Sequence, residues 1–382
     1  MLDGKVAKHK GELGGNMSKR QRWMLASVAI LVGTTAYADT DPPKARPEGA
    51  VWAVVPDFPF AGDDEDVAKK RRSLSGIACP PPAATARLCV AAFDEGGEVR
   101  YVIVDRDKLT PQADHIVLQD DNTELDAEGA ARDGNTIYIT GSHSPPRKKK
   151  PCNNPDSRHV YRFNVDGATG HMIAGAGGKP IPPEDAKNRL WDALAENGTM
   201  KPFVGDGLCL GDPDHAVNIE GLAAKSGVLY FGFREPAEDE TAYIVTVRAD
   251  DLFGPAKLTL GVHQFHVGSG RGIRDLLAVP DGILMLLGPD DDKKNNQPDP
   301  VSWRIAFWDD AKSQAGVIKP RLLAELDLKG LEPNACGDDK KKRGDLKPEA
   351  MTMLENGTDF YRLLILSDGM CNGGPMSFRV NK

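Results

Sequence analysis

Short apolar runs separated by turn residues are the dominant pattern along the chain. Each run has about five to eight residues and is bounded by Gly, Pro, Asn or Asp, which is typical of β-strands joined by tight turns. Two successive groups of four runs show the pattern most clearly, at 220–224, 228–233, 242–248 and 257–262, and at 274–279, 283–288, 301–308 and 321–326. The chain is therefore predicted to be an all-β protein made of four-stranded units.

The first strand of each unit carries a repeated dipeptide. The copies are Ser75-Gly76, Glu128-Gly129, Glu220-Gly221, Arg274-Asp275 and Glu349-Ala350. Successive copies are 53, 92, 54 and 75 residues apart, so a unit has about fifty residues with insertions in two of them, which is in the range of β-propeller blades.

These units predict a five-bladed β-propeller. The last unit ends one strand short after 376–380, and the strand expected at Ala50–Val55 is available to complete it, which would remove an exposed sheet edge. A short helical insertion is expected at Pro183–Glu196 in the long second unit. A six-bladed propeller, with one blade hidden in that insertion, is the alternative.

Residues 1–38 are predicted to be an N-terminal signal peptide with a short extension. Basic residues precede an apolar stretch, and Ala36-Tyr37-Ala38 supplies the small-x-small pattern that precedes cleavage. The stretch is shorter than the roughly 20 residues that span a bilayer, so an uncleaved anchor is the less favoured alternative. Met17 is an alternative start, residues 39–49 are expected to form a linker, and residues 50–382 a single propeller domain.

Charge narrows the range of partners. The chain carries 48 basic and 56 acidic residues, a net charge of −8, and residues 1–38 hold six of the basic and two of the acidic ones. Cleavage therefore brings the net charge to −12. Because binding to phosphate backbones demands a basic surface, nucleic-acid binding is not expected. We expect a periplasmic or secreted monomer with no membrane span after cleavage.

Six cysteines follow the signal peptide, and none of them belongs to a CxxC pair. An even number in an exported protein favours three disulfides. On the five-blade layout the expected pairs are Cys79 with Cys89, Cys152 with Cys209, and Cys336 with Cys371. Six cysteines allow 15 connectivities, so the pairing is predicted from the five-blade layout and not from the number of cysteines.

The repeat places Glu128, Glu220 and Glu349 at one equivalent position facing the propeller axis, with Arg274 in the fourth copy. Calcium accepts several carboxylate oxygens at once, so the three glutamates are a candidate calcium site, with Asp126, Asn218 or Asp275 assisting. The alternative is a structural network in which Arg274 neutralises two of the acids.

Polar residues at the ends of second strands, near the mouth of the channel, are candidate ligand binders. They are Asp94, His143, Arg234 with Glu235, Asp290 and Asp368. We assign ligand binding to Asp94, Asp368, Asp275, Arg234 and Arg274, and in an enzyme His143 is the candidate base beside the two arginines. The acidic runs 63–66 and 290–292 lack the spacing of a calcium loop and are interpreted as solvated.

Basic runs at 69–72, 147–150 and 340–343 all fall in loops that the layout places on the top face. A basic rim around an acidic funnel can gather an anionic ligand despite the net negative charge. The alternative is a set of solvated surface loops.

The repeated Glu-Gly inner strand, with its Lys347-Pro348-Glu349-Ala350-Met351 variant, resembles an exported bacterial propeller family known only as a domain of unknown function. It is more distantly similar to the propeller family labelled "esterase-like activity of phytase". The resemblance covers about Val51 to Val380 and implies a secreted propeller with phosphate-ester hydrolysis as one activity. Arg274-Asp275 and Ser75 depart from the pattern, which puts a uniform acidic metal cluster in doubt.

Three hypotheses follow. The leading one is an exported propeller that binds an anionic small molecule or polymer at its top face together with a divalent cation. The second is a calcium-assisted hydrolase of phosphate or carboxylic esters, with the glutamates holding the metal, Arg234 and Arg274 stabilising the transition state and His143 as base. The third is a scaffold that binds an envelope protein.

Overall fold

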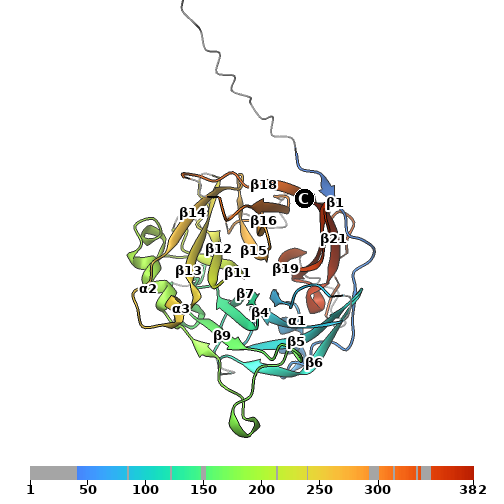
Figure 1. The fold of residues 1–382 in the computed structure, drawn as a ribbon. Coiled ribbons are helices and arrows are strands. Elements are labelled where there is room, and N and C mark those ends of the chain that lie inside the picture. The colour runs from blue at the N-terminus through green and yellow to red at the C-terminus, as the bar shows by residue number, and fades with distance from the viewer. Residues whose placement is uncertain are drawn as a thin grey trace, which may run out of the picture. The chain divides into compact units, whose positions relative to one another are not determined.

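Five sheets follow one another around a central axis in the computed structural model, with the innermost strands meeting at the middle of the ring (Figure 1). The structure describes residues 41–83, 86–120, 123–147, 152–211, 214–238, 240–291, 301–312, 315–332, 334–336 and 346–382. The expected signal peptide and the basic run 340–343 lie outside these residues. The sheets confirm the all-β, five-bladed prediction, and the insertion of the second blade holds no sixth sheet among its described residues.

Each blade begins with its inner strand and proceeds outwards. Blade I contains β3 (Leu74–Ala78), β4 (Arg87–Phe93), β5 (Glu98–Asp105) and β6 (Lys108–Val117). Blade II contains β7 (Ala127–Asp133), β8 (Thr136–Gly141), β9 (Val160–Asn164) and β10 (Glu184–Asp185). Blade III contains β11 (Asn218–Lys225), β12 (Val228–Glu235), β13 (Thr241–Arg248) and β14 (Gly261–His266). Blade IV contains β15 (Arg271–Val279), β16 (Gly282–Pro289), β17 (Arg304–Trp308) and β18 (Arg321–Leu326). Blade V contains β19 (Lys347–Asn356), β20 (Phe360–Asp368) and β21 (Met376–Asn381).

The hydrophobic core is divided among the junctions between blades. Five clusters of buried apolar side chains lie between blades I and II, II and III, III and IV, IV and V, and V and I. Each blade is apolar on both faces because it packs against a neighbour on either side, as in β11, where seven of the eight residues are buried. Burial on both faces explains why these strands read as continuous apolar runs rather than alternating ones.

Glycine follows the repeated position because the next blade approaches closely there. A Cβ on Gly76 would lie 2.8 Å from the backbone nitrogen of Ala130, and one on Gly129 would lie 2.7 Å from the Cβ of Leu222. Both separations are shorter than real Cβ atoms tolerate. The glycines of the repeat therefore let adjacent inner strands pack backbone against backbone.

The N-terminal segment joins three blades, which corrects the expected role of Ala50–Val55. Strand β1 (Lys44–Ala45) pairs in parallel with β18 of blade IV, and β2 (Ala53–Val54) pairs in parallel with β6 of blade I. Between them, Glu48 and Trp52 donate backbone hydrogen bonds to blade V at 2.7 and 2.8 Å. The segment adds backbone contacts to the short last blade, but its strand belongs to the first.

The described residues form more helices than the single helical insertion that the sequence predicts. The described residues form three α-helices, α1 (Asp64–Arg71), α2 (Arg189–Glu196) and α3 (Ala249–Phe253), and short 3₁₀ turns at Pro155–Ser157, Ala176–Gly178, Lys201–Phe203 and Cys371–Gly373. Helix α2 lies within the expected insertion, where Leu190, Trp191 and Leu194 pack into the core between blades II and III. Among the described helices, none is both long and apolar enough to cross a bilayer.

All three predicted disulfides are present. Cys79 joins Cys89 across the turn between β3 and β4, Cys152 joins Cys209, and Cys336 joins Cys371. The bridges close loops with sequence separations of 10, 57 and 35 residues. The layout inferred from the repeat therefore predicted the connectivity correctly.

Candidate functional site

The repeated position is a β-bulge in every blade. The register of the inner strand against its neighbour skips one residue in each sheet, and the skipped residues are Ser75, Glu128, Glu220, Arg274 and Glu349. A bulged residue is left unpaired and its side chain is turned away from the regular alternation. The five bulges therefore bring one side chain from each blade to the centre of the ring.

Arg274 neutralises two of the three glutamates. Its side chain is 1% exposed, its Nε lies 2.7 Å from Glu220 Oε2, and its Nη2 contacts Glu349 Oε1. Burial, followed by repulsion from Arg234, lowers the pKa of Arg274 to about 10, so the guanidinium remains charged at neutral pH. Glu220 and Glu349 are thus members of a buried ion-pair network, which is the structural alternative that the sequence left open.

Arg234 extends this network toward blade IV. Its Nη1 donates to Glu220 Oε1 at 2.8 Å and its Nε lies 3.2 Å from Asp291 Oδ1. Asp291 also lies 2.5 Å from Arg147 Nη2 and accepts from Asn218 at 3.1 Å. Burial alone would raise the pKa of Asp291, but the two arginines hold it below its usual value. The interpretation of 290–292 as a solvated run is therefore wrong for Asp291, which is 5% exposed.

Glu128 belongs to a different group. One carboxylate oxygen from each of Asp94, Asp126 and Glu128 lies within 4.8 Å of the others. Asp94 follows β4 of blade I, Asp126 precedes β7 of blade II, and Glu128 is the bulge of β7, so the three meet between blades I and II. We call these three residues the acidic cluster. None of the ion pairs between described residues involves them.

Burial and repulsion between neighbouring acids perturb the pKa values of all three carboxyls. Burial, then repulsion from Asp368 and Asp126, raises the pKa of Asp94 well above its usual value. Burial, then repulsion from Glu220 and Asp126, does the same for Glu128. Burial also raises the pKa of Asp126 to about 6, although hydroxyls of Ser142 and Ser144 donate to it. The Oδ1 atom of Asp94 is buried and has no hydrogen-bond partner among the described residues.

Such a donor set suits a hard divalent cation. Calcium takes about six to eight oxygen ligands, and three carboxylates supply a large part of them while leaving positions for water or a ligand. A cation would also satisfy the unpartnered oxygen of Asp94. The residues present therefore fit a calcium-like ion.

Of the other predicted ligand-binding residues, Asp275 serves the fold. Its two carboxylate oxygens accept backbone N–H groups of Leu276 at 2.8 Å and Met351 at 2.6 Å. Asp275 occupies the place of the repeat glycine and joins blade IV to blade V through these bonds. Asp368 lies nearer the acidic cluster, where it raises the pKa of Asp94, but Lys347 donates to its Oδ2 at 2.6 Å.

His143 does not lie among the carboxylates of the candidate site. Its Nδ1 lies 3.0 Å from the carbonyl oxygen of Gly141, and the side chain is buried. Burial, with small contributions from His159 and Arg158, lowers the pKa of His143 to about 4. The charged groups that act on its ring are the basic residues His159 and Arg158.

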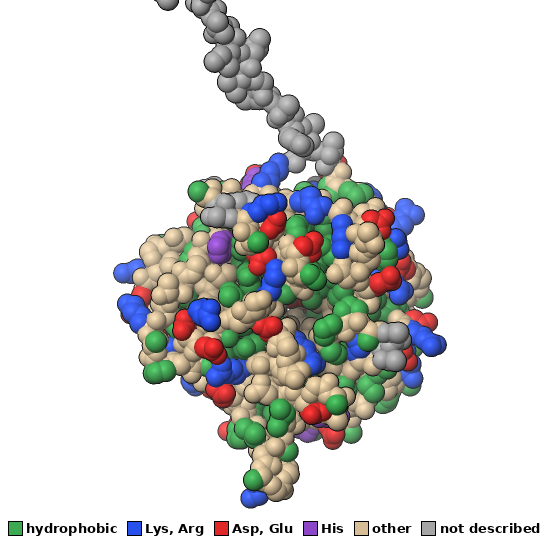
Figure 2. Space-filling model, in the orientation of Figure 1, with side chains coloured by type: hydrophobic (Ala, Val, Ile, Leu, Met, Phe, Trp, Pro, Cys, Tyr) green, Lys and Arg blue, Asp and Glu red, His purple; other side chains and the backbone are tan. Residues whose placement is uncertain are grey.

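Basic and acidic side chains are intermixed around the centre of the face seen in Figure 2. Of the expected basic rim, residues 148–150 and 340–343 lie outside the described residues, whereas 69–72 is not a loop. Asp63 caps α1 by accepting from the backbone of Glu65 and Asp66, and the basic residues form its last turn. Lys69 contacts Glu95, next to the acidic cluster.

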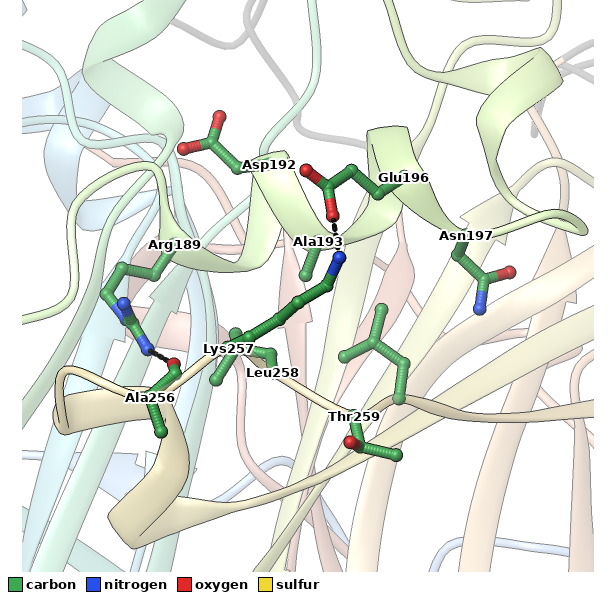
Figure 3. Close-up of a pocket in the computed structure, with 10 residues that line it drawn as sticks. Arg189, Asp192, Ala193, Glu196, Asn197, Ala256, Lys257, Leu258 and Thr259 are labelled. Carbon is green, nitrogen blue, oxygen red and sulfur yellow. Dashed lines mark hydrogen bonds and ion pairs between the residues drawn. The ribbon is translucent and has the colours of Figure 1, made fainter.

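Two cavities lie away from the axis. One, of about 420 Å³, lies between α2 and the segment 256–260, where Lys257 Nζ is 2.8 Å from Glu196 Oε2 and Arg189 donates to the carbonyl of Ala256 at 2.6 Å (Figure 3). The other, of about 370 Å³, is lined by residues of blade IV and the segment 309–321. None of the predicted site residues lines either cavity.

The chain belongs to the family described as "Protein of unknown function (DUF3616)", whose model matches residues 93–166 and 178–373. No curated protein matches the chain. Among solved structures it is similar to a glycosyl hydrolase from Bacteroides ovatus, with a TM-score of 0.41 and 12% identity, covering 89% of this chain and 94% of that one. A periplasmic gluconolactonase of Pseudomonas aeruginosa matches with a TM-score of 0.31 and 12% identity, covering 81% and 88%.

A GH43 β-1,3-galactosidase also matches, with a TM-score of 0.39 and 8% identity over 81% of this chain, which spans only 56% of that protein. Similarity at this level reflects the propeller fold alone, and a fold does not define an activity. The function must be argued from the site.

Sequence reasoning listed Asp94 and Glu128 but did not bring them together, and it named Asp126 only as an assistant. The available signal was topological, because the end of the second strand of one blade lies beside the start of the next blade's inner strand. It missed Ser142 and Ser144, which follow β8 and bind Asp126.

Proposed function

We propose that the protein is an exported propeller that binds a divalent cation, calcium, at the acidic cluster and holds an anionic ligand above it. One observation carries the proposal: Glu220 and Glu349 form ion pairs with buried arginine, whereas Glu128 is grouped with Asp94 and Asp126, and these three form no ion pair among the described residues. Three grouped, partly buried carboxylates that form no ion pair repel one another, and a bound cation would relieve this repulsion. The disulfides are consistent with an exported location.

The anionic ligand is supported by what surrounds the cluster. A calcium ion held by three carboxylates keeps coordination positions that a ligand's carboxylate or phosphate oxygen can take. The amines of Lys69 and Lys347 flank the cluster through Glu95 and Asp368. A carboxylated or phosphorylated sugar would use both features, because its acid group would bind the cation and these amines at the same time.

The test is the melting temperature of the purified, oxidised chain after chelation, with and without calcium. Calcium at 100 times its dissociation constant is expected to stabilise the fold by about 2.7 kcal/mol, a rise of roughly 4 °C for a domain of this size. Glu128→Gln should abolish this rise, and the exposed residue Glu355, changed to Gln, is the matched control that should retain it. Equal responses of the two variants would refute the metal site.

Ligand binding is then tested by calorimetry with glucuronate and glucose 6-phosphate, using glucose as the neutral control. Binding of an acidic sugar that requires calcium and is lost in Lys347→Met supports the proposal. Calcium binding without any response to these sugars would favour the envelope-protein scaffold. Turnover of an ester that stops on chelation would favour the hydrolase, although Arg234 and Arg274 are both engaged by carboxylates in this structure.

A further inference from the structure

The turn that follows β8 holds one oxygen of the acidic cluster. The hydroxyl of Ser142 donates to Asp126 Oδ2, and the hydroxyl of Ser144 lies 3.3 Å from the same atom. Neither of these hydrogen bonds involves Oδ1, the other carboxylate oxygen of Asp126. A carboxylate that is held at one oxygen does not rotate freely, so its second oxygen keeps a fixed direction.

The hydrogen bonds around Ser142 determine where its proton lies. The backbone N–H of Ser144 donates to Ser142 Oγ at 3.0 Å, and the hydroxyl of Ser144 lies 2.9 Å from the same oxygen. A hydroxyl has one proton to donate and two lone pairs that accept. Because an ionised carboxylate only accepts, the proton of Ser142 is the one that lies in the bond to Asp126.

The backbone of Ser142 is held on both sides. Its N–H donates to the carbonyl of Asp126 at 2.8 Å, and its carbonyl accepts the N–H of Ile219, from β11 of blade III, at 2.8 Å. Ser142 is 0% exposed. Asp126 and His143 both have a left-handed φ of 55°, a conformation that persists in residues other than glycine when the surrounding structure holds it. Ser142 is therefore a rigid support for the carboxylate.

We propose that Ser142 is a positioning residue of the calcium site and that Ser144 supports it, an inference that rests on the proposed function. Ser142 holds Oδ2 of Asp126 so that Oδ1 is presented to the cation together with Asp94 and Glu128. One carboxylate oxygen from each of the three acids already lies within 4.8 Å of the others. Asp126 then supplies a single oxygen, which leaves several of the roughly six to eight calcium positions to water and to the anionic ligand.

The experiment measures calcium binding to the full, oxidised chain by calorimetry at a pH of about 7.5, for the parent and for two serine variants. Loss of a hydrogen bond that orients a metal ligand weakens binding about 10- to 100-fold, and Ser142→Ala should fall in this range. Ser144→Ala should lie near its lower end, because this hydroxyl is farther from Asp126. Ser377→Ala is the matched control. It removes the hydroxyl of another buried serine, 1% exposed in β21, and should bind calcium as the parent does.

A spectroscopic readout separates positioning from a purely structural role. Europium takes oxygen ligands as calcium does, and its luminescence lifetimes in H₂O and D₂O count the water molecules on the bound ion. Ser142→Ala should add about one water, because Asp126 is no longer held on the ion. A serine that served only the fold would leave this number unchanged.

The outcomes distinguish this inference from the proposed function. A parent chain that binds neither calcium nor europium would overturn both. A parent that binds calcium, with Ser142→Ala of equal affinity or with an unchanged water count, would overturn the positioning role and leave the calcium site in place. If Ser142→Ala does not fold, the calcium affinity of Ser144→Ala decides the test, and an affinity equal to that of the parent overturns the inference.

Discussion

Removal of the buried guanidinium at the axis is the most direct test of the ion-pair network. Arg274→Met keeps the volume of the side chain but leaves the carboxylates of Glu220 and Glu349 without the cation between them. Breaking a buried pair costs about 3 to 5 kcal/mol, because it leaves an uncompensated buried charge. Arg234 still holds one oxygen of Glu220, so the lower half of this range is expected, and 4 kcal/mol would lower the melting temperature by roughly 6 °C.

The dependence on pH identifies the cause. Buried carboxylates that have lost their counter-ion bind protons more readily in the folded variant than in the unfolded chain. The stability deficit of the variant should therefore shrink as pH falls from 7.5 to 5. A deficit caused by poor packing of methionine would not change in this way.

Urea unfolding at pH 7.5 and pH 5 measures both quantities. The matched control is Arg46→Met, which removes an ion pair with Asp327 at 3.0 Å from an arginine whose side chain is 81% exposed, and should cost less than about 1 kcal/mol. A loss below about 1 kcal/mol for Arg274→Met, or a deficit that is constant with pH, would refute the reasoning.

Three further predictions concern the cluster, the repeat and a disulfide. Because the pKa of Asp126 is raised to about 6, protons compete with calcium, and calcium affinity measured by calorimetry should fall as pH decreases from 7 to 5. Gly129→Ala should lower stability to urea by about 1 to 3 kcal/mol, since its Cβ would overlap Leu222, whereas the exposed Gly134→Ala probes strain alone. Replacing Cys336 and Cys371 by Ser opens a loop with a sequence separation of 35 residues and should lower the free energy of unfolding by about 4 kcal/mol, and a loss below about 1 kcal/mol would show that the bridge is dispensable.

The fold could be predicted because the repeat is a physical requirement of each blade. Every inner strand has a bulge that turns one side chain to the axis, and in four of the five blades a Gly or Ala follows it where the next blade approaches. Those two constraints leave a dipeptide that recurs once per blade and fixes the blade count. The disulfides followed, because the layout shows which loops share a face and which of those loops belong to the same or neighbouring blades.

Helix α1 was missed because its charges were divided into two runs. The acids at 63–66 and the bases at 69–72 were each interpreted as solvated or rim residues. In the structure they are the two ends of one helix, with the acids at its N-terminus and the bases in its last turn, the order that the helix dipole favours. The two runs were interpreted as separate patches of charge. The signal for a helix was their order along the chain, with the acids before the bases.

The division of the central glutamates follows from the order of the blades. Arg274 stands in blade IV, and its guanidinium reaches the bulges of the adjacent blades III and V, which are Glu220 and Glu349. Glu128 stands in blade II, and on its other side blade I offers only Ser75, whose hydroxyl bonds the carbonyl of Ser73. A short side chain at that point leaves room for carboxylates from the neighbouring strand ends, and Asp94 and Asp126 occupy the region beside Glu128. The departures from the Glu-Gly pattern, which cast doubt on a uniform metal ring, therefore concentrate between blades I and II the carboxylates that form no ion pair among the described residues.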